Sequence, residues 1–547
     1  MATKFDRADI QGNILSAYGK LGFPKGRFIT LHIDKPELGR KFVSALLPSV
    51  TTALRWPSER AQATTGEDVV AVRPKVAINI AFTFYGLIAL GIPTRTLRGM
   101  PDEFIDGMIE RAPMLGDNFS GANWLDSWDE VWRKAPQAAR MVDRNTVHML
   151  ITLNAQAQAD GTPVPELDTR TQGIEALCEK VGGVRILPGH GRPSACYQDL
   201  SAIMVKRDDG SIVTSPKEHF GYTDGLGDPV FDGQYPDHSE TRRATGNGAF
   251  DGAGHWRPLA TGEFLLGYPD EAQEVAGATM PLGFSRNGTF MAYRKLHQNV
   301  ATFEKFMSDT ASRFGAVCGI DDPKDALETL KAKIAGRWSD GVPLALAPTA
   351  KEWAEFNAKF PDVWPDRDPK GYRRRGEAVI DFIYRDDPQG LRCPLTSHMR
   401  RANTRDGLAP TADGGSVLNN RRRILRRGLP YGGDTNGAPG SDERGIVMLV
   451  VCANLFRQFE FVQQQWINYG LDANAGNDTC PLIGNHAAGA GKEAKAKFVI
   501  ASDPTTGRPP FVLDGLPQFV ETRGGEYFFV PSMTALRMIG MGVVDPT

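Results

Sequence analysis

The sequence has little cysteine, and its six cysteines are widely separated along 547 residues. They occupy positions 178, 196, 318, 393, 452 and 480, and no two of them form a C-x-x-C pair. Disulfide-rich scaffolds and zinc fingers need closely spaced cysteines, so this spacing argues against both classes. A chain of this kind suits a reducing compartment.

The sequence also lacks a strong net charge and a long uninterrupted hydrophobic run. Its formal net charge is −2, so no overall field draws it to nucleic acid or to an anionic membrane. The apolar stretch 76–93 is broken by Asn79, Gly86 and Pro93, which predicts a buried strand followed by a helix. Residues 1–20 carry early charges and no apolar signal core. We therefore expect a cytoplasmic protein without membrane or nucleic-acid partners.

Two halves of the sequence show the same succession of strand and helix patterns. In the first half, strands are predicted at 27–33, 76–83, 146–155 and 184–190, and helices at 84–91 and 169–183. In the second half, a strand is predicted at 262–269, and strands that run into helices at 288–310, 444–470 and 525–540. This rhythm predicts an α+β fold of two ferredoxin-like, split βαβ domains with antiparallel sheets.

A chain of this length is too long for one hydrophobic core, so several domains are expected. The patterns place an N-terminal domain at 1–205, a connecting segment at 206–261 and a C-terminal domain at 262–547. The connecting segment is rich in Gly, Asp and Pro, and a second irregular stretch, 336–443, is rich in Pro, Arg and Gly. Structureless loops longer than about 15 residues are uncommon unless they are functional. We therefore expect the chemistry to be built from these two stretches.

The connecting segment contains the run HFGYTDGLGDPVF (219–231), which places His219, Asp224 and Asp228 among glycines and aromatic residues. The simplest interpretation is a surface turn, because Asp-Gly tolerates the backbone angles of tight turns. A functional role for Asp224 needs support from the rest of the sequence.

The run LRCPLTSHMRRANTR (391–405) places His398 close to several arginines. A single histidine is most often a hydrogen-bonded polar residue. A zinc site needs three or four ligands, and Cys393 brings no partners. One axial histidine beside several cations does suit haem, which takes a protein ligand and carries two propionates.

The run NNRRRILRRGLPYGGD (419–434) holds five arginines. A solvated basic face or an anion patch is the simplest interpretation, and nucleic-acid binding lacks interleaved aromatic residues for stacking. Ile424 and Leu425 indicate that the segment enters the interior, where a guanidinium requires an anionic partner or a charged cofactor. If the segment were helical, Arg422 and Arg426 would share a face.

Six segments occur together in one order: GYTDG (221–225), GEFLLGYPDE (262–271), NGTFMAYRKLHQ (287–298), CPLTSHMRRANTR (393–405), RRILRRGLPYG (422–432) and RQFEFVQQQWIN (457–468). In this arrangement the sequence resembles the dye-decolorizing peroxidase family, haem enzymes built from two ferredoxin-like domains. The resemblance runs from DIQGNIL (9–15) to GEYFFVP (525–531) and so covers nearly the whole chain. Its length and its insertions, such as 310–375, resemble the larger subgroup.

The resemblance implies a distal pair of catalytic residues. The family's G-x-x-D-G motif falls on Gly221, Asp224 and Gly225, which makes Asp224 the distal carboxylate and Gly225 a haem contact. The arginine before P-Y-G falls on Arg426, the distal cation. A carboxylate can take a proton from peroxide and return it. An ordinary aspartate has a pKa of about 3.9, so we expect turnover to be fastest at acidic pH.

The resemblance also implies the proximal side of the haem. His398 matches the iron ligand, and Arg405 looks like a propionate partner. A carboxylate that fixes the imidazole ring is expected as well. Asp478 in GNDTCPLIG is the first choice and Glu460 the second, although a loop cap and a solvated helix residue are their simpler interpretations.

The function that follows is a haem peroxidase with haem b (iron protoporphyrin IX) in the C-terminal domain. It would use hydrogen peroxide to oxidise dyes, phenols or similar aromatic reductants in one-electron steps through a ferryl intermediate. Homo-oligomer formation is compatible with it. The alternatives are a haem-binding or iron-release protein with little turnover, and an anion-binding protein without haem. Asp224 and Arg426 argue against a carrier, because a carrier needs neither residue.

Overall fold

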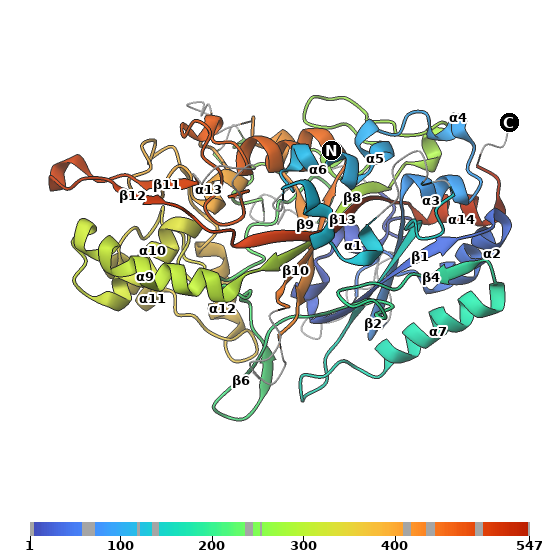
Figure 1. The fold of residues 1–547 in the computed structure, drawn as a ribbon, viewed down its shortest axis with the longest axis horizontal. Helices are drawn as coiled ribbons and strands as arrows, with labels where there is room; N and C mark the ends of the chain where they lie inside the picture. Colours follow the sequence, from blue (N-terminus) through green and yellow to red (C-terminus); the bar gives the residue numbers. More distant parts are fainter. Residues whose placement is uncertain are drawn as a thin grey trace.

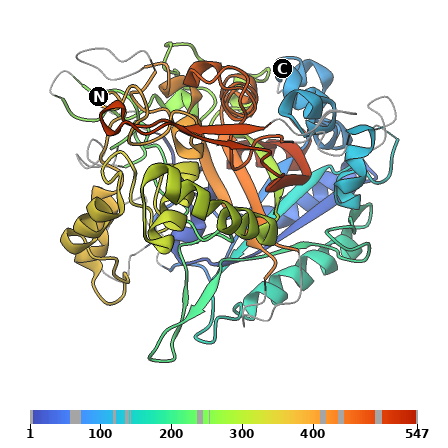
Figure 2. The ribbon, with the colours of Figure 1, turned by 60° about the vertical axis from the view of Figure 1, so that its left-hand side comes forward.

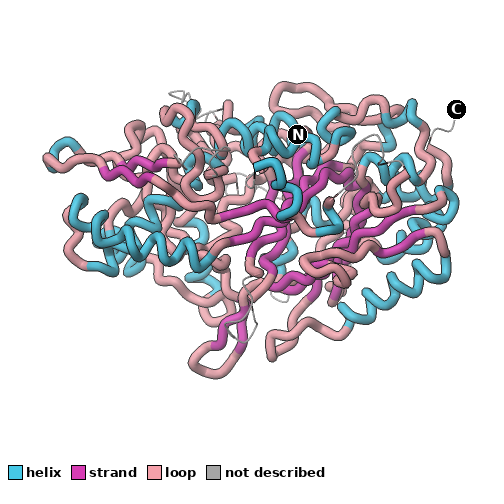
Figure 3. Tube along the Cα trace, in the orientation of Figure 1, coloured by secondary structure: helices cyan, strands magenta, loops and turns pink. Residues whose placement is uncertain are grey.

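The structure is a computed structural model that describes residues 5–56, 72–117, 121–133, 140, 142–235, 244–251, 254–408, 417–433, 443–486 and 496–544. A central sheet runs through the molecule, with helices packed at both of its ends (Figure 1). The secondary-structure colouring shows the strands as a band through the middle of the chain, surrounded by many loops (Figure 3).

The N-terminal half builds an antiparallel unit of four strands in the order β4-β1-β3-β2. The strands are β1 (Lys25–Ile33), β2 (Val76–Phe82), β3 (Met149–Ala155) and β4 (Val184–Ile186). Helix α2 (Pro36–Leu46) follows β1, and α7 (Glu166–Val181) joins β3 to β4. Phe42, Val43 and Leu46 of α2 are buried at helical spacing, so one face of this helix packs on the core.

The C-terminal half repeats this arrangement, with strands in the order β13-β8-β10-β9. They are β8 (Thr289–Gln298), β9 (Leu425–Tyr431), β10 (Gly445–Cys452) and β13 (Val520–Val530). Helix α9 (Val300–Cys318) follows β8, the π-helical turns η9 (Leu455–Glu460) and η10 (Val462–Ile467) follow β10, and α14 (Met533–Met541) follows β13. When the strands of each half are numbered along the chain, their order across the sheet is 4-1-3-2 in both halves. This order confirms two ferredoxin-like units.

The two halves share one sheet and one interior. Strands β2 and β13 pair at Phe82 and Phe529, which joins the two units, and β5 (Gln198–Ser201) adds to β1. β5 also lies close to β9, so the sheet curls back on itself. Across the interior the ring of Phe28 lies 6.3 Å from that of Tyr293. The domain boundaries at 205 and 262 remain predictions.

Two expectations for the second half are wrong. Residues 262–269 form no strand: they hold the short 3-10 turn η6 (Thr261–Glu263) and a turn at Gly267, whose φ is +83°. The strand that completes this four-stranded unit is instead β9, in the arginine-rich segment where a helix was considered. Pro430 is tolerated there because β9 is the last strand of the sheet path.

The stretch 336–443 is partly helical rather than irregular. It contains α11 (Ala350–Lys359), α12 (Pro369–Ala378) and α13 (His398–Ala402), and α10 (Pro323–Ala335) precedes it. Helices α9 to α12 gather at the end of the molecule opposite α2 and α7 (Figure 1 and Figure 2), whereas α14 packs against α2. No helix in the described residues is both long enough and apolar enough to cross a membrane.

The remaining elements are short and lie around this frame. They are α1 (Gly12–Leu15), η1 (Tyr18–Leu21), η2 (Leu47–Ser49), α3 (Phe84–Ala89), α4 (Thr94–Leu97), α5 (Asp102–Asp106), α6 (Met108–Leu115), η3 (Gly121–Ser127), η4 (Glu130–Trp132), β6 (Met204–Lys206), β7 (Ile212–Thr214), η7 (Leu282–Phe284), η8 (Asn420–Arg422), η11 (Leu471–Ala473), β11 (Lys497–Ile500), η12 (Pro504–Thr506) and β12 (Phe511–Asp514).

Candidate active site

The loop that carries Asp224 is fixed by a partly buried carboxylate. Glu218 accepts hydrogen bonds from the backbone N–H groups of Phe220 and Tyr222, both at 2.9 Å. The N–H of Asp224 donates to the carbonyl of Pro216 at 2.9 Å, and Thr223 donates to the carbonyl of Ser339 at 3.1 Å. These bonds hold the loop in one conformation.

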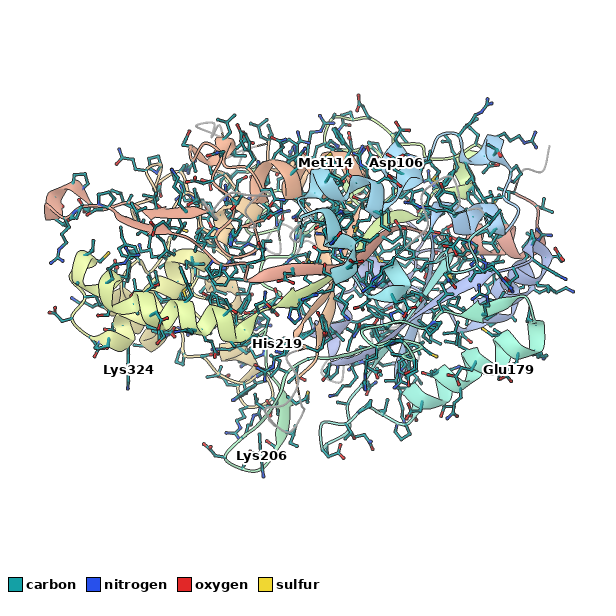
Figure 4. The ribbon with its side chains drawn as sticks, viewed as in Figure 1. Asp106, Met114, Glu179, Lys206, His219 and Lys324 are labelled. Carbon is teal, nitrogen blue, oxygen red and sulfur yellow. The ribbon has the colours of Figure 1, made fainter. Side chains whose placement is uncertain are left out.

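The loop also approaches the end of β9. His219, labelled in Figure 4, lies with Nε2 at 3.0 Å from the carbonyl oxygen of Tyr431. Gly221 and Gly225 have φ values of +91° and +76°, in the left-handed region that favours glycine. The loop therefore has both the anchoring and the glycines that a tight turn beside a strand requires.

Asp224 forms an ion pair with Arg426, which projects from β9. Nη1 of Arg426 donates to Oδ1 of Asp224 at 2.9 Å, although 202 residues separate the two in the chain. Neither side chain is fully covered: Asp224 is 46% exposed and Arg426 is 35% exposed. The pair is thus accessible to a small molecule while each partner holds the other in place.

Electrostatics keep both members of the pair charged. Burial disfavours the charged form of Asp224, but Arg426, the backbone N–H of Gly225 and Lys20 outweigh it, so the pKa of Asp224 lies below its ordinary value. Attraction to Asp224 is the largest effect on Arg426 and raises the pKa of that guanidinium. The carboxylate is therefore available as a proton acceptor even at acidic pH.

His398 begins helix α13, and its ring is electrostatically coupled to the same pair. Burial, together with Arg426 and Arg401, lowers the pKa of His398 to about 4 against the opposing effect of Asp224. The imidazole is consequently neutral near pH 7, which is the form that ligates metals. The structure thus brings Asp224, Arg426 and His398 within electrostatic reach of one another, although they come from a loop, a strand and a helix.

The Nδ1 atom of His398 contacts a cysteine rather than a carboxylate. Sγ of Cys480 lies 3.4 Å from it. Asp478 instead lies with Oδ1 at 3.8 Å from Nζ of Lys497. Glu460 accepts from Nη2 of Arg111 at 2.6 Å and from the hydroxyl of Tyr527 at 2.8 Å. In this structure the oxygens of Asp478 and Glu460 are thus directed to cations and a phenol, and a carboxylate partner of the imidazole stays a prediction.

Arg405 and Gly225 also differ from expectation. Arg405 is 1% exposed, donates to the carbonyls of Ile380 at 2.8 Å and Phe382 at 3.0 Å, and stacks on the Phe382 ring. Its φ of +49° turns the chain just after α13. A Cβ at Gly225 would meet Cε of Lys20 at 2.9 Å. The Arg405 guanidinium thus binds backbone carbonyls, and the side chain that lies close to Gly225 is that of Lys20.

The surroundings of Arg426 fit an anionic cofactor. Burial is the main cause that lowers the pKa of Arg337 and of Arg423 to about 10 and that of Arg405 to about 9, and Arg426 contributes to the first two shifts. The hydrogen bonds of Arg423 go to the carbonyls of Gly227, Gly246 and Asn247. An interior with so many guanidiniums favours a ligand that carries negative charge.

The donor set also fits a haem better than a metal held by side chains alone. Within the described ranges, no three His, Cys, Asp or Glu side chains gather as a metal ion would require. His398 makes its ring contact through Nδ1, which leaves Nε2 for an axial bond to iron. A neutral histidine, a partly exposed acid–cation pair and an excess of buried arginines are the features that a haem pocket of a catalyst needs.

Comparisons with known proteins show similarity to dye-decolorizing peroxidases. The family model described as "DyP dimeric alpha+beta barrel domain" matches residues 9–181. "Peroxidase 2" from Mycetinis scorodonius is 27% identical over 97% of this chain and 86% of its own length, and "Dye-decolorizing peroxidase msp1" from the same fungus is 25% identical over 97% and 87%. A dye-decolorizing peroxidase solved in complex with 2,6-dimethoxyphenol superposes with a TM-score of 0.67, at 23% identity, over 98% of this chain and 100% of that one.

Proposed function

The chain belongs to the dye-decolorizing peroxidase family, and from this membership we propose that it is a haem peroxidase that uses hydrogen peroxide to oxidise dyes, phenols and similar reductants. The observation that supports the proposal most directly is the Asp224–Arg426 ion pair, coupled to a neutral His398. We further propose haem b as the cofactor, bound in the C-terminal unit beneath the connecting segment 206–261.

His398 would hold the cofactor. Its Nε2 would bind iron and its Nδ1–H would donate to Cys480, so the contact at Nδ1 selects the tautomer that the metal needs. The haem, when bound, supplies the redox chemistry that reduces peroxide and withdraws single electrons from the reductant. The buried guanidiniums of Arg337, Arg405 and Arg423 provide the positive potential that its carboxylates would offset.

Asp224 and Arg426 would handle the proton and the charge of peroxide cleavage. The carboxylate of Asp224 would take the proton from one oxygen of hydrogen peroxide and return it to the other oxygen, which leaves as water. Arg426 stabilises the negative charge that develops as the O–O bond breaks. Their ion pair holds the acceptor oxygen of Asp224 in place, so little reorganisation is needed when peroxide arrives.

A spectrum and a turnover assay test the proposal together. Purified protein supplied with haem should show a Soret band that changes on addition of peroxide, and it should then oxidise an anthraquinone dye or 2,6-dimethoxyphenol repeatedly. Haem binding without turnover would favour the carrier alternative. A protein that develops no Soret band would favour the anion-binding alternative and contradict the proposal.

We expect Arg426→Leu to lower kcat/KM for peroxide by about 10²- to 10³-fold, the usual cost of removing one charge-stabilising donor. The same substitution removes the guanidinium that depresses the pKa of Asp224. The acid limb of the kcat/KM profile, which reports protonation of Asp224, should therefore move to higher pH. A pH series of peroxide reactivity measures both effects.

Arg421→Leu is the matched control for Arg426→Leu. It makes the same change of charge five residues earlier, on a side chain that is 40% exposed and that pairs with Asp270 at 3.6 Å. We expect this variant to keep both the rate and the pH profile of the unsubstituted protein. An Arg426→Leu profile with an unmoved acid limb would contradict the assigned coupling.

A further inference from the structure

The sulfur of Cys480 occupies the position at which a carboxylate would orient the iron-binding histidine. It lies 3.4 Å from Nδ1 of His398, within the range of a hydrogen bond to sulfur. Cys480 is completely buried, so water does not compete for this contact. Asp478, two residues earlier, points its carboxylate to Lys497 instead.

The backbone holds Cys480 firmly in this position. Its N–H donates to the carbonyl of Ile467 in η10 at 2.7 Å, and its own carbonyl accepts from the N–H of Gly484 at 3.0 Å. Nε2 of His486 lies 2.8 Å from the same carbonyl. Helix α13, which begins at His398, packs against η10. Sulfur and imidazole are thus positioned by elements that contact each other directly.

Burial raises the pKa of the Cys480 thiol, so the sulfur is neutral, and the polar groups around it oppose this effect only in part. The backbone N–H groups of Leu482, Ile483 and Gly484 interact with the thiol, and so does the Arg401 guanidinium. Arg401 is 2% exposed, and within the described residues its Nε and Nη1 have no hydrogen-bond partner. A buried guanidinium with free donors beside a sulfur atom favours electron density on that sulfur. The side of the sulfur that faces His398 can then accept a hydrogen bond from the Nδ1–H of that ring.

We propose that Cys480 replaces the carboxylate as the hydrogen-bond acceptor of the proximal His398 and is a positioning residue that tunes the iron ligand. The inference rests on the proposed haem peroxidase function. Sulfur is a weaker acceptor than a carboxylate, so His398 has less imidazolate character than it would beside an aspartate. The iron should consequently be less electron-rich, with a higher Fe(III)/Fe(II) potential than a carboxylate partner would give.

The test uses the haem-loaded protein with Cys480→Asp, Cys480→Ala and Cys480→Ser. We expect Cys480→Asp to lower the Fe(III)/Fe(II) midpoint potential and to raise the iron–histidine stretching frequency in the resonance Raman spectrum of the ferrous form. Cys480→Ala should shift both quantities in the opposite directions, and Cys480→Ser should bring them back toward the unsubstituted protein. A merely structural role for the thiol would not produce shifts of opposite sign.

Cys452→Ala is the matched control, because Cys452 is equally buried but lies at the end of β10. It should leave the potential and the iron–histidine band unchanged. Equal potentials and equal bands in the unsubstituted, Asp and Ala proteins would overturn the inference. If the Asp and Ala variants do not load haem, the inference is tested with the size-conserving Ser variant and with the iron–histidine band of the unsubstituted protein. A band typical of an imidazolate in the unsubstituted protein would also overturn the inference. An unsubstituted protein that binds no haem would instead overturn the proposed function.

Discussion

Replacing His398 with alanine is expected to lower haem affinity by more than about 100-fold and to remove the Soret band of the ordinary ligand state. The reason is that His398 would provide the only protein bond to iron, and even the loss of a residue that merely supports a metal ligand costs about 10- to 100-fold. Within the described residues, the hydrogen-bond contact of the His398 ring is the one to Cys480. The fold should therefore survive loss of the ring. Titration with haem, followed at the Soret maximum, measures the effect.

Two further observations make the His398→Ala result specific. Removal of the imidazole leaves a space of its own size next to the iron position, so added imidazole should restore part of the Soret band. The control is His255→Ala, since His255 is 64% exposed and pairs with Asp251. It should bind haem like the unsubstituted protein. A full-strength, unshifted Soret band in His398→Ala would remove His398 from the ligand role.

The fold was predictable from the sequence wherever a strand had an apolar pattern and ran directly into a helix. Residues 289–318 and 445–467 are of this kind, and both are strand and helix in the structure. β9 was missed because arginines, Gly428 and Pro430 hide its alternation. Helix α11 was missed for another reason: it lies in a stretch rich in Pro, Arg and Gly, and its apolar residues Trp353 and Phe356 are only partly buried. The pairing of Phe82 with Phe529 is a contact that no local pattern contains.

The candidate site divides in the same way. Asp224 and Arg426 were expected in one site from motifs far apart in the chain, and in the structure they form an ion pair at 2.9 Å. The partner of His398 was predicted to be a carboxylate, Asp478 or Glu460, whereas the structure places Cys480 beside its Nδ1. Chemistry favours a carboxylate beside an imidazole, whereas the direction of each side chain in the loop 478–480 depends on Lys497 and Arg401, which no local pattern reveals.

Asp224→Asn is expected to slow the reaction with hydrogen peroxide by about 10²- to 10⁴-fold, the usual contribution of a positioned acid–base group. The amide keeps the size of the side chain and can still contact Arg426, but it cannot take a proton from peroxide. Haem binding should persist, because Asp224 is not the proposed iron ligand and the substitution leaves His398 in place. Stopped-flow measurement of the peroxide reaction isolates this step from oxidation of the reductant.

Asp228→Asn separates loss of the base from loss of a charge in the same loop. Asp228 pairs with Arg427 at 3.2 Å and with Lys20 at 3.5 Å, and Arg427 alternates with Arg426 along β9. Asp228→Asn should therefore retain most of the peroxide reactivity. If both variants lost activity equally, the charge of the loop would matter rather than the proton chemistry of Asp224. If Asp224→Asn reacted with peroxide at the unsubstituted rate, Arg426 and the haem would have to cleave the O–O bond without it, and the depressed pKa of Asp224 would reflect only its ion pair.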